Sequence, residues 1–226
     1  MNKNLKYRTI FFSFLAIFSF SKALSQSTVK LFNRKNLTGW YAFEPATGKQ
    51  TNAENLFHVK NKMIRLYGDK IGYLMSEKSF NNFQLTVEFR WNTDSTFSRK
   101  SNKKNSGIMY LIPPETPDEL WPKGIQFQVK DGATGDFVLL QNVTLNVNGK
   151  QTEAGKSVTS ARFADAEKPF GEWNIAVITS LNGKIKQELN GKLVNEGIQN
   201  EISEGRVLLQ YEGYPIDFRK IIIKEL

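Results

Sequence analysis

The side chains that could do chemistry in this sequence are polar residues that alternate with apolar ones. From Phe83 to Trp91 every second residue is apolar, which predicts a strand with Thr86, Glu88 and Arg90 on its other face. Such a strand fixes the direction of the Glu88 side chain, so Glu88 is the best carboxylate candidate in the sequence.

A second alternating string, Ile125 to Lys130, places Gln126, Gln128 and Lys130 on one face. Polar rows on adjacent strands could line a sugar-binding groove, or they could be ordinary solvent-facing residues. Asp131 follows this string and is a second carboxylate that could do chemistry. Asp near Gly is more often a turn residue that bonds its own backbone, so that alternative stays open.

Two further strings offer hydrogen-bonding or charged groups. Asn105 and Ser106 precede Gly107, which permits close approach of a backbone, and they could bind sugar hydroxyls or simply lead a loop into a strand. Asp217 and Arg219 alternate onto one face of the last predicted strand. They could belong to the groove or form a plain cross-strand ion pair.

The sequence lacks the motifs of several other kinds of catalytic or cofactor site. It contains no Cys and a single His, His58, which lies between Phe57 and Val59, so it predicts no disulfide and no His-rich metal site. No Gly-x-Ser-x-Gly elbow and no phosphate-cradling loop are present. We therefore expect no metal and no cofactor.

Most of the chain reads as short strands separated by turn signals such as Asn190-Gly191, which is typical of an all-β sandwich or barrel. Only Ala161–Glu167 has the character of a short helix, which Pro169 would end. The segments 92–105 and 113–123 are expected to be loops at the sandwich edge. Besides the two strings above, the candidate strands are 56–59, 63–66, 107–112, 136–140, 173–179, 185–189, 206–211 and 218–224.

Five strings together resemble the 3-keto-disaccharide hydrolase domain family, from about Val29 to Leu226. The resemblance implies a concanavalin A-like jelly roll, a sandwich of two antiparallel sheets with one concave face. It also implies that Trp173 is a core residue and that Asn174 is a structural hydrogen-bonder. The strings are Leu31 to Trp40, Asn105 to Ile108, Trp121 to Gln128, Glu167 to Asn174 and Asp217 to Ile221.

With this fold, alternation predicts that Glu88, Arg90, Gln126, Gln128 and Arg219 line the concave face together. The family is associated with sugars oxidised to a ketone at C3, whose C2 hydrogen one base can remove so that the C1 substituent leaves. The resemblance thus implies an enzyme that cleaves 3-keto-glycosides, with a base, donors for the enolate oxygen and an acid for the leaving group.

The assignment of these roles stays open at this point. Glu88 or Asp131 could be the base, and Arg90, Arg219 or Lys130 could stabilise the enolate. Many members of the family carry Glu where this chain has Gln126, and Gln cannot exchange a proton as an acid or base. This departure favours the alternative of a non-catalytic carbohydrate-binding module. A structural protein of the cell envelope is a third alternative.

Residues 1–25 have the order of a secretion signal: a basic start, an apolar run from Ile10 to Phe20 and a small-x-small site before Gln26. Residues 26–226 then form one domain, periplasmic or secreted and, without Cys, not lipid-anchored. Removing four basic signal residues lowers the formal net charge from +9 to about +5. The basic stretch Arg99–Lys104 is expected to be a solvated loop, and secretion and the lack of interleaved aromatics argue against a nucleic-acid partner. The expected partner is the carbohydrate substrate that the family resemblance implies. The oligomeric state stays open.

Overall fold

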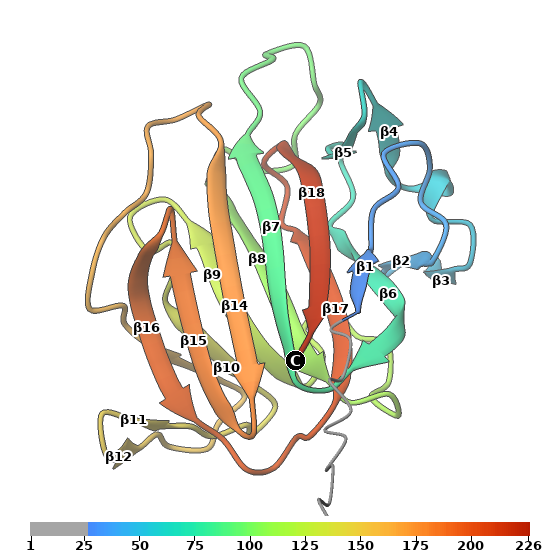
Figure 1. Cartoon of the computed structure of the whole chain (residues 1–226). Coiled ribbons are helices and arrows are strands. Elements are labelled where there is room, and N and C mark those ends of the chain that lie inside the picture. Colours follow the sequence, from blue (N-terminus) through green and yellow to red (C-terminus); the bar gives the residue numbers. More distant parts are fainter. Residues whose placement is uncertain (1–26) are drawn as a thin grey trace, which may run out of the picture.

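A computed structural model describes residues 27–226 of the 226-residue chain. The predicted signal peptide lies outside the described residues. The described part consists of two antiparallel sheets packed face to face, and Figure 1 views them with sheet A in front of sheet B. Its one helical element is a 3₁₀ turn, η1, at Ala53–Asn55, so no helix of residues 27–226 has the length and apolar character needed to cross a membrane.

Sheet A contains ten strands. They are β1 (Thr28–Lys30), β4 (His58–Lys60), β5 (Met63–Leu66), β7 (Phe83–Trp91), β11 (Asn146–Val147), β12 (Lys150–Gln151), β14 (Asn174–Leu181), β15 (Lys184–Leu189), β16 (Lys192–Ile198) and β18 (Ile216–Glu225). Their order is β12-β11-β16-β15-β14-β7-β18-β5-β4, and β1 also pairs with β18. The two longest strands, β7 and β18, therefore lie side by side.

Sheet B contains eight strands. They are β2 (Trp40–Glu44), β3 (Gly48–Gln50), β6 (Gly72–Phe80), β8 (Asn105–Ile112), β9 (Gly124–Lys130), β10 (Phe137–Leu140), β13 (Ser157–Ser160) and β17 (Gly205–Tyr211). Their order is β13-β10-β9-β8-β17-β6-β2-β3. The predicted sandwich of two antiparallel sheets is confirmed, and the predicted strands 63–66 and 83–91 coincide with β5 and β7.

The main core fills the space between the sheets. On β7 the residues Phe83, Leu85, Val87 and Phe89 are fully buried there, as period-two alternation predicts. Hairpin turns fix the register of several strands. At Asn190-Gly191 both residues have positive φ, the conformation that Asn and Gly tolerate best in a tight hairpin.

Sheet B is also buried on part of its outer face, the face turned away from the main core. A second apolar cluster lies there, and the segment 113–123 packs over it. The hydroxyls of Tyr41 and Tyr73 donate to Asp118 of this segment at 2.6 and 2.7 Å, and Arg206 donates to the Thr116 carbonyl at 3.2 Å. The segment is a loop, as predicted, but it covers a sheet face instead of lying at an edge. The cluster comprises Tyr41, Phe43, Tyr73, Met75, Met109, Ile112, Val138, Leu140 and Leu208.

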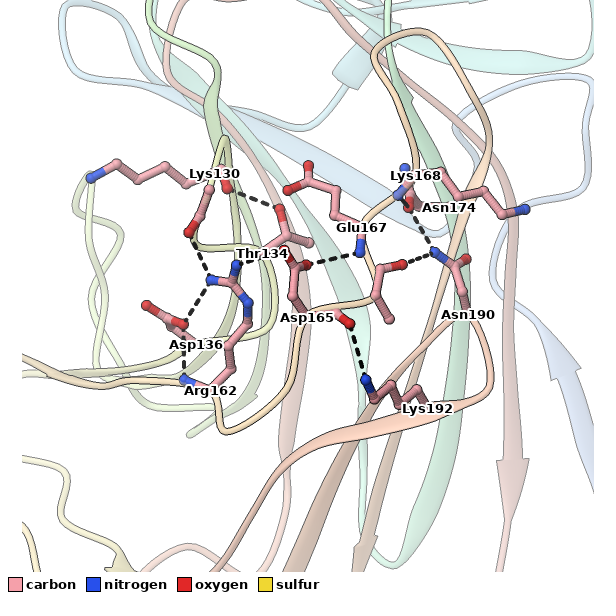
Figure 2. A network of polar contacts seen from close by, with 12 residues as sticks. Lys130, Thr134, Asp136, Arg162, Asp165, Glu167, Lys168, Asn174, Asn190 and Lys192 are labelled. Carbon is pink, nitrogen blue, oxygen red and sulfur yellow. Dashed lines mark hydrogen bonds and ion pairs between the residues drawn. The ribbon is translucent and has the colours of Figure 1, made fainter.

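A polar network holds the segment that connects β13 to β14 (Figure 2). Arg162 donates its backbone N–H to Asp136 at 3.0 Å, and Asn190 donates to the Asn174 side chain at 2.8 Å. Asn174 is buried and also accepts from the Lys168 N–H, so the predicted structural role of Asn174 is confirmed. The predicted helix at 161–167 is wrong, because these side-chain bonds hold the segment without regular secondary structure.

Candidate functional site

A cavity of about 570 Å³ lies on the outer face of sheet B, beside the part that segment 113–123 covers. Its size suits a small ligand such as one or two sugar rings. Amides, one carboxylate, one indole and a few apolar side chains form its walls. The lining residues are Asn105, Trp121, Gln126, Gln128, Val138, Leu140, Gln141, Lys156, Ser157 and Glu212.

Strands β8 and β9 build the polar floor of this cavity. Gly107 pairs with Gln128 across the two strands, and the Gln126 side chain lies over Gly107. A Cβ at position 107 would come within 2.4 Å of the Gln126 Cδ, so only glycine fits there. Gln126 Nε2 donates to Gln128 Oε1 at 2.6 Å, which fixes both amides in the floor.

Trp121 forms one wall and comes from the end of the covering segment. Its side chain is 42% exposed, and its carbonyl accepts from Gln141 Nε2 at 3.2 Å. An indole presents a flat apolar surface together with one N–H donor. The apolar face of a sugar ring could stack on such a surface while its hydroxyls bond to the amides of the floor.

Glu212 follows β17 and is the one carboxylate among the described residues that line the cavity. It accepts a hydrogen bond from Asn105 Nδ2. Burial raises the pKa of Glu212 above its ordinary value, because desolvation penalises the charged form. Hydrogen bonds from Trp121 and Asn105 and the charge of Lys130 oppose this rise of the pKa but do not cancel it. A raised pKa brings a carboxylate closer to the range that suits a general base.

Of the residues predicted to bind substrate, Asn105, Gln126 and Gln128 line the cavity. Lys130 lies on the same strand, and its charge acts on Glu212. The prediction that Ser106 binds substrate is wrong, because Ser106 is fully buried and donates its hydroxyl to the Gln210 carbonyl at 2.7 Å. Its position on β8 matches that of the core residues Ile108 and Tyr110, so a ligand in the cavity does not reach it.

The prediction that Glu88, Arg90 and Arg219 share one face with Gln126 and Gln128 is wrong. The first three lie on β7 and β18 of sheet A, and the two glutamines lie on β9 of sheet B. Period-two alternation tells which side chains leave the core, but each sheet of a sandwich has its own outer face. One substrate therefore cannot contact Glu88 and Gln126 together.

Asp131 lies at the end of β9 and does not line the cavity. Its side chain is 65% exposed and pairs with Lys104 Nζ at 2.9 Å, so the structural alternative to a catalytic role fits its surroundings. Asp217 and Arg219 form cross-strand ion pairs with β7, the alternative noted above. Asp217 pairs with Arg90 at 3.1 Å and Arg219 with Glu88 at 2.6 Å.

Trp173 also differs from the prediction, since it is not a core residue. It is partly exposed on sheet A, where the guanidinium carbons of Arg90 and Arg219 lie 4.7 and 4.0 Å from its ring centroid. Within residues 27–226, no three Asp, Glu, His or Cys side chains come together in a way that could hold a metal ion.

The sequence reasoning missed Glu212, and it noted Trp121 only as part of a string. A signal for Glu212 was present, because it follows the predicted strand 206–211 and precedes Gly213. In period-two alternation Glu212 shares a strand face with Gln210, opposite the apolar Leu209 and Tyr211, and this would have directed it away from the core. The sequence contained no sign that a neighbouring strand would bring Asn105 to it.

The fold and the cavity together define a jelly-roll protein of the carbohydrate-active kind. Residues 27–224 match the sequence profile of a family described as a 3-keto-alpha-glucoside-1,2-lyase-like domain. The chain belongs to this family, which is the one that the five strings indicate. No curated protein sequence is similar enough to the chain to count as a match.

Solved structures resemble the chain in fold. A candidate glycosyl hydrolase from Parabacteroides distasonis is 20% identical, with 88% of this chain and 94% of that one covered and a TM-score of 0.63. The β-glucanase of Bacillus licheniformis is 13% identical, with coverage of 91% and 100% and a TM-score of 0.54. The carbohydrate-binding module CBM66 from Bacillus subtilis is 13% identical, with coverage of 83% and 96% and a TM-score of 0.52. Identities this low carry the fold alone.

Proposed function

We propose that the protein cleaves 3-keto-glycosides in the sheet B cavity, with Glu212 as the base that removes the C2 proton. The observation that carries this proposal is a single, partly buried carboxylate with a raised pKa in a sugar-sized cavity of amides and one indole. A C3 ketone acidifies the C2 hydrogen, so one base is enough to begin the cleavage. The family description supports the same substrate class.

The reaction proceeds by elimination and hydration. Glu212 takes the C2 proton, and the electrons of the C2–H bond form an enolate whose charge rests on the C3 oxygen. The enolate collapses to restore the ketone, a C1–C2 double bond forms, and the C1–oxygen bond to the aglycone breaks. The aglycone oxygen takes up a proton as it leaves, and Lys156 is the candidate donor at the cavity wall. Water then adds its hydroxide to C1 and a proton to C2.

The ordinary glycosidase mechanism needs different catalytic residues. It uses two carboxyl groups on either side of the glycosidic bond, roughly 5–10 Å apart. Glu212 has no carboxylate partner among the described residues that line the cavity. The neutral amides of Gln126 and Gln128 instead offer hydrogen bonds to an enolate oxygen without adding a second charge.

The test is incubation of the protein with 3-keto-trehalose or 3-keto-sucrose in D₂O, with the unoxidised disaccharides as controls. We expect cleavage of the 3-keto-sugars only, and deuterium at C2 of the released 3-keto-glucose. A parallel sample of 3-keto-glucose measures exchange that occurs without cleavage. Cleavage of the unoxidised sugars at a similar rate, or product with hydrogen retained at C2, would contradict the proposal.

A second candidate function is a non-catalytic carbohydrate-binding module. Gln126 favours it, because the position offers an amide where many family members carry a carboxylate. The fold is also that of a solved carbohydrate-binding module. In this case titration calorimetry would detect binding of a 3-keto-sugar or a disaccharide without turnover. The wild type and Glu212→Gln would then both be inactive.

We further propose that the protein acts after export, in the periplasm or outside the cell. The support is the basic, apolar and small-residue order of residues 1–25. Mass spectrometry of the exported protein should find an N-terminus at Gln26. A product that begins at Met1 would contradict this proposal without affecting the chemistry.

A further inference from the structure

The outer face of sheet A carries a second cavity, of about 430 Å³, on the opposite side of the sandwich from the first. Four cationic side chains line it, and one carboxylate, Glu88, accompanies them. The cations are Lys30, Arg34, Arg219 and Lys220. Two segments far apart in the sequence contribute them, so they are not the by-product of one basic run.

A β-bulge in β18 places two of these cations together. Phe218 and Ile221 both face the main core, and the pairing with β7 shifts register between Phe218 and Lys220. The two residues between them, Arg219 and Lys220, therefore both line the outer cavity, where regular alternation would have turned one inward. Their side chains are 40% and 48% exposed.

A tight turn presents a third cation, Arg34, to the same cavity. Asn33 Oδ1 accepts the backbone N–H groups of Lys35 at 2.7 Å and Asn36 at 2.9 Å, which closes the turn around Arg34. Arg34 has a φ of +66°, a left-handed conformation that non-glycine residues rarely adopt. The turn thus holds a strained backbone in which the Arg34 side chain lines the cavity.

Positive charge is in excess at this cavity. Glu88 pairs with Arg219 at 2.6 Å and approaches Lys220 at 3.7 Å, so one carboxylate serves two cations. Lys30 and Arg34 have no acidic partner within ion-pair distance in the part of the chain that the structure describes. The lining residues therefore carry a surplus of three positive charges, four cations against one anion.

The surroundings limit what could neutralise this surplus. The ring of Trp173 is occupied by the guanidinium groups of Arg90 and Arg219, and Phe32 is 4% exposed, so the described residues at this cavity offer no free aromatic surface to nucleic acid bases. None of the large exposed apolar side chains of residues 27–226 lines the cavity, which disfavours insertion into a membrane. A polar ligand with several negative charges fits best.

We propose that this cavity binds an anionic polysaccharide through its carboxylate or sulfate groups. Such binding would hold the protein on a charged glycan while the sheet B cavity faces away from it. The occupant is a glycan because the fold and the family are those of carbohydrate-active proteins. The proposal goes beyond cleavage at Glu212 and does not depend on it.

The test is affinity electrophoresis of the whole protein in native gels that contain polygalacturonate or dextran sulfate, with neutral dextran as the reference. We expect retardation by at least one of the polyanions and none by dextran. The double variant Lys30→Glu/Arg34→Glu should raise the apparent Kd by at least about tenfold, since it replaces two cations that would face the anionic glycan by anions. The matched control Lys150→Glu/Lys184→Glu changes the net charge equally on distant strands of sheet A and should bind nearly as the wild type does.

Equal loss of binding in the two double variants would reduce the effect to net charge and overturn the proposal. The proposal would also be overturned if neither polyanion retarded the protein. It would be overturned as well if the same residues bound only DNA or anionic vesicles. Turnover of a 3-keto-disaccharide should stay the same in both variants, because none of the four residues lines the sheet B cavity. The two proposals therefore fail independently of each other.

Discussion

The outer faces of the two sheets each hold a partly buried glutamate, and the surroundings of these glutamates differ. Glu88 on sheet A pairs with the Arg219 guanidinium at 2.6 Å and lies near Lys220. Glu212 on sheet B receives neutral hydrogen bonds from Asn105 and Trp121, and burial raises its pKa. The Glu88 carboxylate is engaged by cations, whereas desolvation of Glu212 favours its protonated form. The comparison indicates that the partners of a carboxylate, more than its strand position, decide whether it suits proton transfer.

The two partly exposed tryptophans repeat this contrast. The ring of Trp173 on sheet A lies within 5 Å of the guanidinium carbons of Arg90 and Arg219. Trp121 at the sheet B cavity is 42% exposed and has no cation over its ring in the described part of the chain. An uncovered indole can receive a sugar ring, so the two faces differ in the ligand each could hold.

The largest expected effect tests which of the two glutamates is the catalytic base. Glu212→Gln should lower single-turnover cleavage of a 3-keto-disaccharide by about 10²–10⁴, the usual worth of one general base. Glu88→Gln should leave the rate within about twofold, because Glu88 is on the opposite sheet. Stopped-flow measurement on both variants decides the matter. A large loss in Glu88→Gln with an unaffected Glu212→Gln would reverse the assignment of the base.

The second prediction compares an acidic side chain on each outer face, the fully buried Asp217 on sheet A and the partly buried Asp118 over sheet B. Asp217 is fully buried and pairs with Arg90 at 3.1 Å, with Arg65 3.7 Å away. Asp217→Asn should lower the free energy of unfolding by about 3 kcal/mol, since it leaves two guanidinium groups without a counter-ion.

The matched control for this prediction is Asp118→Asn. Asp118 accepts from two neutral hydroxyls, and an Asn oxygen can still accept them, so this change should cost about 1 kcal/mol. Urea denaturation measures both values. Equal losses would show that the ionic network of sheet A contributes no more than neutral hydrogen bonds do.

The third prediction concerns the amide floor of the sheet B cavity. Gln126 Nε2 donates to Gln128 Oε1 at 2.6 Å, and a carboxylate at position 126 cannot donate. Gln126→Glu should therefore lower the free energy of unfolding by about 1–3 kcal/mol and should not raise turnover, because a new anion would oppose the enolate. Single-turnover kinetics and urea denaturation of this variant test both parts. A rise in turnover would instead identify position 126 as the site of the missing acid or base.

The strand pattern of the sequence is enough to predict most of sheet A. The alternation from Phe83 to Trp91 and the Asn-Gly turn at residue 190 each specify local geometry that the structure keeps. Strand β2, Trp40–Glu44, was not predicted, because all five of its residues are buried and no alternation remains. Its second buried face exists only because segment 113–123 folds over it, which is a tertiary contact.

Only part of the candidate site was predicted, because local patterns do not reveal which strands become neighbours. Gln126 and Gln128 were identified because their neighbours on β9 are core residues, and Asn105 because it belongs to the polar string that precedes Gly107. Alternation could not say that Glu88 and Gln126 belong to different sheets, since strand order depends on long-range pairing. Glu212 depends on the meeting of β8 with the end of β17, which no local pattern encodes.

The fourth prediction uses the raised pKa of Glu212. As a base Glu212 must be ionised, so turnover should fall as pH drops through its raised pKa, at a higher pH than the ordinary glutamate value of about 4.3. Because the folded-state pKa exceeds the unfolded one, the stability that this group contributes is fully present below the unfolded pKa. This contribution is lost as pH rises through the folded pKa.

Glu212→Gln removes the titrating group and should therefore become more stable relative to the wild type as the pH rises from the ordinary glutamate range through the raised pKa. Thermal unfolding of both proteins across this range measures the difference in Tm. If the difference is constant, or shrinks as pH rises, the Glu212 pKa is not raised in the folded protein.

The smallest expected effect compares two fully buried glutamines. The Nε2 and Oε1 of Gln210, on β17, have no hydrogen-bond partner among residues 27–226. In Gln187, on β15, only the Oε1 lacks a partner within these residues, because Nε2 donates to the Tyr110 hydroxyl at 2.9 Å. Burying an unpaired amide is unfavourable, so Gln210→Met should be neutral or should raise the free energy of unfolding by about 1 kcal/mol. Gln187→Met should lower it by about 1–2 kcal/mol, because the buried Tyr110 hydroxyl loses its partner. Urea denaturation separates the two outcomes. A destabilised Gln210→Met that also loses turnover would mean that the Gln210 amide is satisfied by an ordered water or the ligand, and would extend the sheet B site to β17.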